Sequence, residues 1–316
     1  MTSSDIQVAV AVIINQKNEV LISLRAESAH QGGLWEFPGG KLEANESVSD
    51  ALKRELFEEL NIKVRSSKPF MLINHAYSDK TVILNIHTVD AFDGIPKGAE
   101  GQKIQWKSID QLSPMDFPAA NRGIIQSLTF PDKYMITGEF TDQTDFLFKL
   151  EKSLEQGIKF VQFRCKKLEP ADYLALADLA NDLCKKFNAF LFLNTSPDIF
   201  HQTSTQGLHL NSLLLHSLSI RPIPIDKLLS VSCHTSDDIK QAKKLNADII
   251  LLSPVKETKS HPGVKGIGWK CFSELILRVD IPVYALGGMS ALDVADAKIS
   301  GAQGIAAISS LWVNQN

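Results

Sequence analysis

Three glutamates are the residues whose type and spacing point most directly to chemistry. Glu55, Glu58 and Glu59 stand at positions i, i+3 and i+4 of a segment with helical periodicity over 47–60, so they share one face of the expected helix. Carboxylates this close repel one another, and hard divalent cations such as Mg²⁺ prefer carboxylate oxygens. The pattern therefore indicates a metal site, with a solvated acidic helix as the structural alternative.

The residues around these acids narrow the choice. Gly39 and Gly40 precede the helix, Glu46 leads into it, and Arg54 stands beside the first acid. This arrangement resembles the signature of the Nudix hydrolases, which cleave pyrophosphate bonds. The chain has Asn61 where that family usually has glycine. Because the site lies just past a helix end, where Asn is the usual second choice for a left-handed residue, we expect the departure to be tolerated.

The resemblance implies a metal centre. Its cofactor would be Mg²⁺, with Mn²⁺ as a substitute, and its ligands would come from the helix acids and the glycine backbone: Gly39, Gly40, Glu55, Glu58 and Glu59. We expect Arg54 to pair with Glu58 one turn on. Glu100 falls on the loop glutamate that the family places near the metal, as a further base or ligand. By spacing alone Glu100 would be a surface acid.

Further segments resemble the MutT branch of the family, which hydrolyses 8-oxo-dGTP to the monophosphate and pyrophosphate. They lie at 24–26, 35–43 and 116–121, within a resemblance that covers residues 5–128. The implied substrate contacts are Arg25, His30, Glu36, Phe37, Pro38, Gly39, Tyr77 and Asn121. The amide of Asn121 offers both a donor and an acceptor, which suits an oxidised purine edge. The structural alternatives are a core position for Phe37, an ion pair for Arg25 and a solvated loop for His30.

The second half of the chain has a different regularity. Short apolar runs recur near 134–137, 159–163, 189–193, 207–210, 229–232, 248–252, 282–285 and 304–308. Helical segments separate several of them, at 170–186, 236–245 and 291–299, and we expect short helices at 197–204 and 212–217. Alternation of strand and helix predicts a parallel sheet, and eight units predict a (β/α)8 TIM barrel. A doubly wound open sheet is the alternative.

Segments at 161–166, 207–210, 232–235, 252–255, 260–263 and 285–289 resemble the thiamine phosphate synthases and their thiazole tautomerase relatives. The resemblance implies a phosphate site at Gly287, Gly288 and Ser309, after the last two strands, whereas a tight turn is the alternative for the glycine pair. The chain has Thr195 and Leu214 where the synthases have metal-binding aspartates, and neither side chain replaces a carboxylate. We therefore expect a barrel that lacks synthase activity and binds a phosphorylated ligand of the thiamine pathway, with a barrel that retains other chemistry as the alternative.

The bulk properties agree with a two-domain α/β enzyme. The chain has 316 residues, and we expect a Nudix α/β/α sandwich with a mixed sheet over 1–130 and the barrel over 131–316. In the first domain we expect a hairpin of strands 7–15 and 20–25, strands at 81–89 and 103–106, and a helix at 121–128. The net charge of −3 argues against a nucleic-acid partner. The four cysteines form no C-x-x-C pair, so the sequence gives no support for zinc.

Long apolar stretches and a signal peptide are not apparent in the sequence, so we expect a cytoplasmic protein with no membrane partner. The predicted activity is that of a hydrolase acting on phosphoric anhydrides, of the 8-oxo-dGTP diphosphatase type, which removes oxidised nucleotides before DNA replication. The alternative is a pyrophosphohydrolase of a thiamine-related diphosphate or of another nucleoside diphosphate derivative. Both substrates are small molecules.

Overall fold

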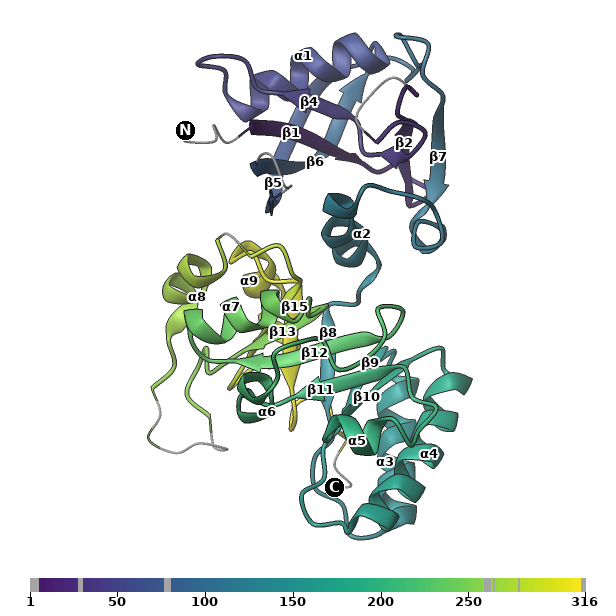
Figure 1. The fold of residues 1–316 in the computed structure, drawn as a ribbon, viewed down its shortest axis with the longest axis vertical. Helices are drawn as coiled ribbons and strands as arrows, with labels where there is room; N and C mark the ends of the chain where they lie inside the picture. Colours follow the sequence, from purple (N-terminus) through teal and green to yellow (C-terminus); the bar gives the residue numbers. More distant parts are fainter. Residues whose placement is uncertain are drawn as a thin grey trace. The chain divides into compact units, whose positions relative to one another are not determined.

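The computed structural model describes residues 6–27, 31–76, 81–258, 263, 265–277 and 279–313. The chain divides into two compact units, one reaching essentially to Thr129 and the other beginning at Phe130 (Figure 1). Among the described residues, no helix combines the length and the apolar character needed to cross a membrane. The four cysteines are free thiols.

The first unit contains the expected mixed sheet. Strands β4 (Gly39–Lys41), β1 (Ile6–Ile13), β6 (Thr81–Asp93) and β5 (Lys63–Ala76) lie in that order, with β1 parallel to β6 and the other neighbours antiparallel. Strands β3 (Trp35–Glu36), β2 (Glu19–Leu24) and β7 (Ile104–Ser108) form a second, antiparallel sheet. Two 3-10 turns, η1 (Ile109–Gln111) and η2 (Ala119–Asn121), lead to helix α2 (Arg122–Thr129).

Alternation along β1 explains the layers of this unit. Successive side chains of a strand point to opposite faces. Ala9 and Ala11 are buried with Leu52 and Leu56 of helix α1 (Val48–Leu60), whereas Val10 belongs to the core that contains Ile124 of α2 and the second sheet. One helix therefore covers each face of β1, which is the expected α/β/α sandwich.

The predicted hairpin of 7–15 and 20–25 is wrong. Beyond the turn, β1 and β2 share only an isolated bridge between Ile14 and Val20, and they belong to different sheets. The reason is that β4 occupies one edge of β1 and β6 occupies the other. A strand has two hydrogen-bonding edges, so β2 is left to pair with β3 and β7.

The second unit is the predicted barrel. Strands β8 (Lys133–Ile136), β9 (Phe160–Phe163), β10 (Phe190–Asn194), β11 (Gly207–Leu210), β12 (Leu228–Cys233), β13 (Ile249–Leu252), β14 (Val283–Leu286) and β15 (Gly304–Ala307) form a closed barrel. All neighbours are parallel, and β15 pairs with β8 to close the ring. The open-sheet alternative is therefore wrong.

Helices of very different length follow the barrel strands. The long ones are α3 (Gln143–Glu155) and α4 (Pro170–Lys186), and the others are α5 (Pro197–Phe200), α6 (Ser212–Ser217), α7 (Ser236–Lys244), α8 (Gly268–Ile276) and α9 (Val294–Ile299), which follows the 3-10 turn η3 (Ala291–Asp293). Helix α4 has the predicted bounds. The short helices α5 and α6 explain how the barrel fits into this length of chain.

The inside of the barrel has an apolar layer below a polar one. Tyr134, Phe160 and Phe192 form part of a buried aromatic cluster. Inward positions recur every second residue, so the next inward residues toward the strand ends are Gln162 after Phe160 and Asn194 after Phe192. The polar layer therefore lies toward the carboxyl ends of the strands, where barrels of this kind hold their sites.

Candidate active site

Helix α1 is formed and ended by signals that its sequence carries. Ser47 is the N-cap, and its side chain accepts a hydrogen bond from the Asp50 N–H. Asn61 adopts the left-handed conformation with φ of 54° and ends the helix, as predicted. Leu52 and Leu56 are fully buried, which fixes the rotation of the helix and turns Glu55 and Glu59 toward the Gly39–Gly40 strand.

Among the described acids of this unit, Glu59 has the most strongly shifted pKa. Burial raises the pKa of its carboxyl to about 8, and repulsion from Glu36, Glu55 and Glu100 acts in the same direction. The Gly39 N–H donates to Glu59 Oε2 at 3.1 Å and opposes the shift. Glu59 is too buried for the alternative of a solvated acidic helix to hold at this position. Glu58, by contrast, is exposed. The local excess of negative charge is what a cation would neutralise.

The glycine pair permits the helix to approach this closely. A Cβ on Gly40 would lie 2.1 Å from the carboxyl carbon of Glu55, and a Cβ on Gly39 would lie 2.1 Å from the Ala9 carbonyl oxygen. Gly39 also has a φ of 144°, which side-chain-bearing residues rarely adopt. Gly39 is therefore required by the packing of β4 against the backbone of β1, whereas Gly40 leaves the space that the Glu55 carboxylate occupies.

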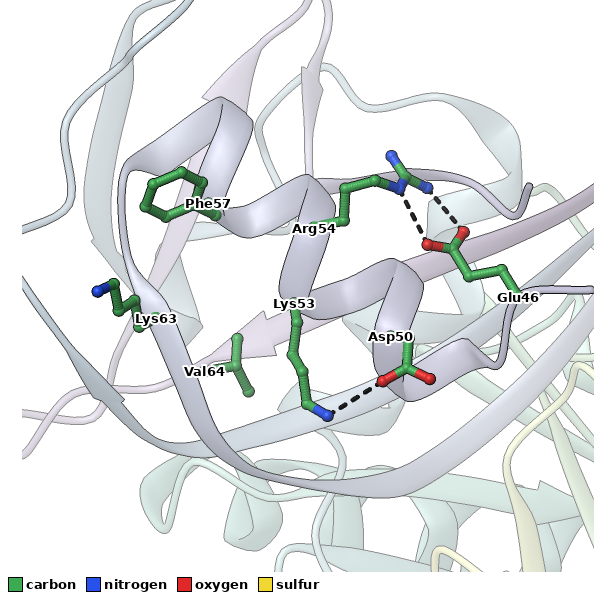
Figure 2. Close-up of a pocket in the computed structure, with 7 residues that line it drawn as sticks. All are labelled: Glu46, Asp50, Lys53, Arg54, Phe57, Lys63 and Val64. Carbon is green, nitrogen blue, oxygen red and sulfur yellow. Dashed lines mark hydrogen bonds and ion pairs between the residues drawn. The ribbon is translucent and has the colours of Figure 1, made fainter.

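Arg54 connects the acids to the preceding loop. Its guanidinium donates to both carboxylate oxygens of Glu46 at 2.8 and 2.9 Å, to Glu55 Oε1 at 2.7 Å and to the Lys41 carbonyl at 3.0 Å. The expected contact with Glu58 exists at 3.5 Å but is the longest of these. Arg54 is thus mainly a brace between Glu46 and Glu55, and Figure 2 shows the pair with Glu46.

A groove runs beside this brace. It is lined by Glu46, Asp50, Lys53, Arg54, Phe57, Lys63 and Val64, and Figure 2 shows Lys53 paired with Asp50, at 3.1 Å. At about 100° per residue, Lys53 and Phe57 lie on the side of α1 opposite Glu55 and Glu59. The groove is therefore separate from the acid cluster and carries none of its three helix acids.

Glu100 reaches the cluster because its loop covers the carboxyl end of α1. The Lys97 N–H donates to the Leu60 carbonyl at 3.1 Å, and the Ala99 N–H donates to the Glu59 carbonyl at 2.9 Å. The last carbonyls of a helix have no partner within it, so this loop satisfies them. Glu100 is exposed, yet it is close enough to Glu59 to contribute to its raised pKa.

The expected substrate residues take several different environments. Arg25 forms an ion pair with Glu36, and burial raises the pKa of Glu36 while Arg25 opposes that shift. Phe37 is 3% exposed and stacks on Phe117, with ring centroids 5.6 Å apart, so it is a core residue whatever else it contacts. The Pro38 carbonyl accepts from the Ala11 N–H at 2.8 Å.

Asn121 is the residue best suited to recognise a ligand. It ends the 3-10 turn η2 and is 9% exposed. Among the described residues its side-chain amide forms no hydrogen bond, while its backbone N–H donates to the Pro118 carbonyl at 2.9 Å. Its amide donor and acceptor are therefore available. The two other predicted contacts, His30 and Tyr77, lie outside the described residues.

The acids of the cluster are suitable ligands for a hard cation by their chemical type, but their side chains are not arranged around a common centre. Within the described part of the chain, no three His, Cys, Asp or Glu side chains gather closely enough to hold a metal ion. Arg54 draws Glu55 Oε1 to itself, but a carboxylate has two oxygens and several acceptor positions. Carboxylate and carbonyl oxygens are the donors that Mg²⁺ prefers, and the crowding around Glu59 favours a positive charge there.

The polar layer of the barrel forms a chain of uncharged groups. His209 lies between Ser230 and Ser232, with Nδ1 3.0 Å and Nε2 2.9 Å from the two hydroxyls. The Tyr134 hydroxyl is 3.3 Å from Ser230, and Gln162 Nε2 is 3.5 Å from Tyr134. Burial, and secondarily the positive charge of Arg164, lowers the pKa of His209 to about 3. His209 is therefore neutral at physiological pH.

His209 and its serine partners were absent from the predicted site. The signal was available, because Gln162, Asn194 and His209 occupy inward positions near the ends of adjacent strands in register. Asn194 Nδ2 donates to Gln162 Oε1 at 3.4 Å, so the chain of polar groups has members on five strands, β8 to β12.

The predicted phosphate residues follow the expected strands. Gly287 and Gly288 come directly after β14, with φ of 99° and 64°, and Ser309 lies exposed in a turn after β15. A Cβ on Gly287 would lie 2.9 Å from Pro254, and one on Gly288 would lie 2.5 Å from the Glu257 carbonyl oxygen. The close contact with the loop after β13 is thus enough to explain why both positions are glycine.

Thr195 and Leu214 stand where we expect the synthases to have aspartates. Thr195 follows β10, and Leu214 lies in the first turn of α6, where its N–H donates to Asn211. Neither side chain is a ligand for a hard cation.

Family models match both units. The model described as NUDIX domain matches residues 9–127, and the model described as thiamine monophosphate synthase matches residues 133–311. An 8-oxo-dGTP diphosphatase of Escherichia coli is 38% identical over 123 residues, covering 39% of this chain and 95% of the relative. A protein described as a candidate second thiamine-phosphate synthase of Aquifex aeolicus is 35% identical over 182 residues, covering 58% of this chain and 98% of the relative. A thiamine-phosphate synthase of Methanobrevibacter smithii is 29% identical over 184 residues, covering 58% and 88%.

The chain therefore belongs to the Nudix family through its first unit and to the thiamine monophosphate synthase family through its barrel. It is a hydrolase of the class that acts on phosphoric anhydrides, and Nudix hydrolases generally use a divalent metal ion. Both families handle small phosphorylated molecules.

Proposed function

We propose that the Nudix unit hydrolyses 8-oxo-dGTP to 8-oxo-dGMP and pyrophosphate with Mg²⁺, and that Mn²⁺ substitutes for it. The observation that carries the proposal is the cluster around Glu59, a partly buried carboxyl surrounded by Glu36, Glu55 and Glu100 and contacted by the Gly39 N–H. In this proposal Glu55, Glu58, Glu59 and the backbone of Gly39 and Gly40 hold the metal. When bound, the ion would neutralise charge that develops on the phosphate oxygens.

The protein's own groups have distinct roles in this proposal. Arg54 keeps the Glu55 carboxylate at the edge of the cluster through its brace to Glu46. Glu100 accepts the proton of the attacking water or adds a ligand oxygen. Arg25, Glu36, Phe37, Pro38 and Asn121 contact the nucleotide, as do His30 and Tyr77.

The proposed preference for an oxidised purine rests on Asn121. Oxidation at C8 gives the purine an N7–H donor beside an 8-oxo acceptor, and a side-chain amide offers the complementary pair. The amide of Asn121 has no partner among the described residues. A site built to hydrogen-bond one substrate discriminates against an analogue that lacks the matching group, because its own polar atoms are then left unpaired.

A substrate panel tests the proposal. The full chain is assayed with Mg²⁺ on 8-oxo-dGTP, dGTP and thiamine diphosphate, and products are separated by anion-exchange chromatography. We expect 8-oxo-dGTP to have the highest kcat/KM and to yield pyrophosphate. Equal and feeble turnover of both purine nucleotides would refute the specificity, whereas preference for thiamine diphosphate would favour the second candidate, a thiamine-related pyrophosphohydrolase, which the barrel's family membership supports.

For the barrel we propose binding of a phosphorylated ligand of the thiamine pathway without synthase activity. The neutral chain of His209, Gln162 and the serines offers donors and acceptors to a heteroaromatic ring, and Gly287, Gly288 and Ser309 are assigned to the phosphate. Calorimetry of the full chain with thiazole phosphate tests the binding. Formation of thiamine phosphate from the two synthase substrates would refute the proposed loss of activity.

A further inference from the structure

One side chain connects the loop of Glu100 to the helix of Glu59. The amide Nε2 of Gln102 donates to the Glu59 carbonyl at 2.9 Å, and its Oε1 accepts from the Glu100 N–H at 3.0 Å. Both distances are those of ordinary hydrogen bonds. A single amide therefore bonds to the backbones of two acids from separate elements.

The loop itself is tightly folded around this amide. Gly98 approaches the Gln102 backbone so closely that a Cβ would lie 1.9 Å from the Gln102 carbonyl oxygen, and Gly101 has a φ of 83°. The Glu59 carbonyl also accepts from the Ala99 N–H at 2.9 Å. Glu100 thus lies in a small turn that is closed by the Gln102 side chain on one side and by the helix end on the other.

We propose that Gln102 is a positioning residue that sets the location of Glu100 relative to Glu59. This inference rests on the proposed function of the acid cluster and deepens it. Glu100 is exposed, and its backbone N–H donates to the Gln102 amide, so this bond helps to fix the backbone from which the Glu100 carboxylate projects. Errors of about 1 Å in the position of a group that takes part in catalysis can cost on the order of 100-fold in rate.

Substitutions of Gln102 in the full chain test the proposal. Gln102→Met keeps the length of the side chain and removes both hydrogen bonds, whereas Gln102→Glu keeps the acceptor for the Glu100 N–H and removes the donor. We expect Gln102→Met to lower kcat about tenfold, with the KM for the nucleotide changed less than about twofold. Gln102→Glu should lose at least as much, because it places a carboxylate oxygen against the Glu59 carbonyl and adds negative charge beside the acids. Gln105→Met, on the neighbouring strand β7, is the matched control and should keep both parameters.

A double-mutant cycle separates positioning from general damage to the fold. If Gln102 acts through Glu100, the variant Glu100→Gln/Gln102→Met should be no slower than Glu100→Gln alone, because coupled residues are not additive. Hydrogen exchange of the peptide over 97–103 in the metal-free protein should become faster in Gln102→Met. A kcat within twofold of the parent, fully multiplicative effects, or unchanged exchange would each overturn the proposal.

The same assay keeps this proposal distinct from the proposed function. The cycle is run on dGTP as well as on 8-oxo-dGTP, with Glu59→Gln as the inactive reference. If 8-oxo-dGTP is not preferred, the specificity fails while the cycle on dGTP still tests Gln102. If neither nucleotide is hydrolysed, the proposed function fails and hydrogen exchange alone decides whether Gln102 holds the loop.

Discussion

The acid cluster of the Nudix unit and the polar layer of the barrel both bury an ionisable group. Burial shifts the pKa of the two groups in opposite directions. In the first, carboxylates crowd together and the pKa of Glu59 rises to about 8. In the second, His209 is buried between two serine hydroxyls and its pKa falls to about 3. Burial disfavours the charged form in both cases.

The difference lies in what each region still needs. The barrel layer is built from uncharged groups that hydrogen-bond to one another, with Ser230 and Ser232 on His209 and Tyr134 beside Gln162. Among the described residues, two arginines pair with acids of the cluster. Arg25 forms an ion pair with Glu36, and the side-chain hydrogen bonds of Arg54 go to Glu46, Glu55 and Glu58 and not to Glu59. The negative charges gathered in the acid cluster favour binding of a metal ion. The neutral groups of the barrel layer suit an uncharged ring.

The largest expected effect concerns turnover. Glu59→Gln removes the most perturbed carboxyl while keeping its shape, and we expect kcat on 8-oxo-dGTP to fall at least about 100-fold. Steady-state kinetics with saturating Mg²⁺ measure this. The matched control is Glu43→Gln, because Glu43 is an exposed acid outside the cluster. Undiminished activity of Glu59→Gln would show that the metal assignment is wrong.

The next effect concerns selectivity. Asn121→Leu keeps the approximate size of the side chain but removes both its donor and its acceptor. Because the acceptor is what pairs with the N7–H that only the oxidised purine has, we expect the preference for 8-oxo-dGTP over dGTP to fall about tenfold. The ratio of the two kcat/KM values measures it. Loss of activity on both nucleotides in equal proportion would contradict a role in recognising the base.

A third effect should appear in stability without metal. In the folded protein Glu59 keeps its proton up to a pKa of about 8, but in the unfolded chain it loses the proton above about 4.5. The folded state therefore binds more protons between these values, and this group lowers stability as pH rises through the window. We expect Glu59→Gln to have a higher Tm than the parent at pH 8 in EDTA, by roughly 4 °C or more.

Scanning calorimetry at pH 5 and pH 8 checks that prediction. The difference in Tm between Glu59→Gln and the parent should grow with pH, while Glu43→Gln should show no such trend. A difference that is constant with pH would mean that Glu59 carries no raised pKa in the folded state.

The smallest effect belongs to the barrel and has the opposite sign. His209 has a pKa of about 3 when folded and about 6.5 when unfolded, so its contribution to stability is present above pH 6.5 and is lost as pH falls toward 3. In His209→Gln the barrel transition should therefore shift by a few degrees less between pH 7 and pH 5 than in the parent. The exposed His201 provides a matched His201→Gln control. Equal shifts in His209→Gln and the parent would contradict a buried neutral histidine.

Much of the fold could be predicted because its signals are local. Apolar runs marked the barrel strands, and Ser47 and Asn61 marked the ends of α1. Strand β5 (Lys63–Ala76) was not predicted, because Pro69 and several register shifts interrupt its pattern. The hairpin of β1 and β2 failed because strand pairing depends on which edges distant segments occupy.

The sequence predicted which residues form the candidate site, but not which residues their side chains contact. The helix acids followed from their spacing, whereas the main partner of Arg54 is Glu46, which comes from a loop rather than from the helix. Gln102 carried no signal, because a glutamine in a polar loop is ordinary until the loop folds onto the helix end. The inward position of His209 could not be recognised as part of a site from the sequence alone, because that depends on the register in which β9, β10 and β11 pair.

Metal binding tests the contrast between the two regions most directly. Electron paramagnetic resonance of Mn²⁺ titrated into the full chain counts bound ions without requiring a substrate. We predict binding to the parent protein and its loss in the double variant Glu55→Gln/Glu59→Gln, with Glu43→Gln unchanged. Mn²⁺ binding that persists undiminished in the double variant would contradict the assignment of this chain's metal chemistry to the acids of α1.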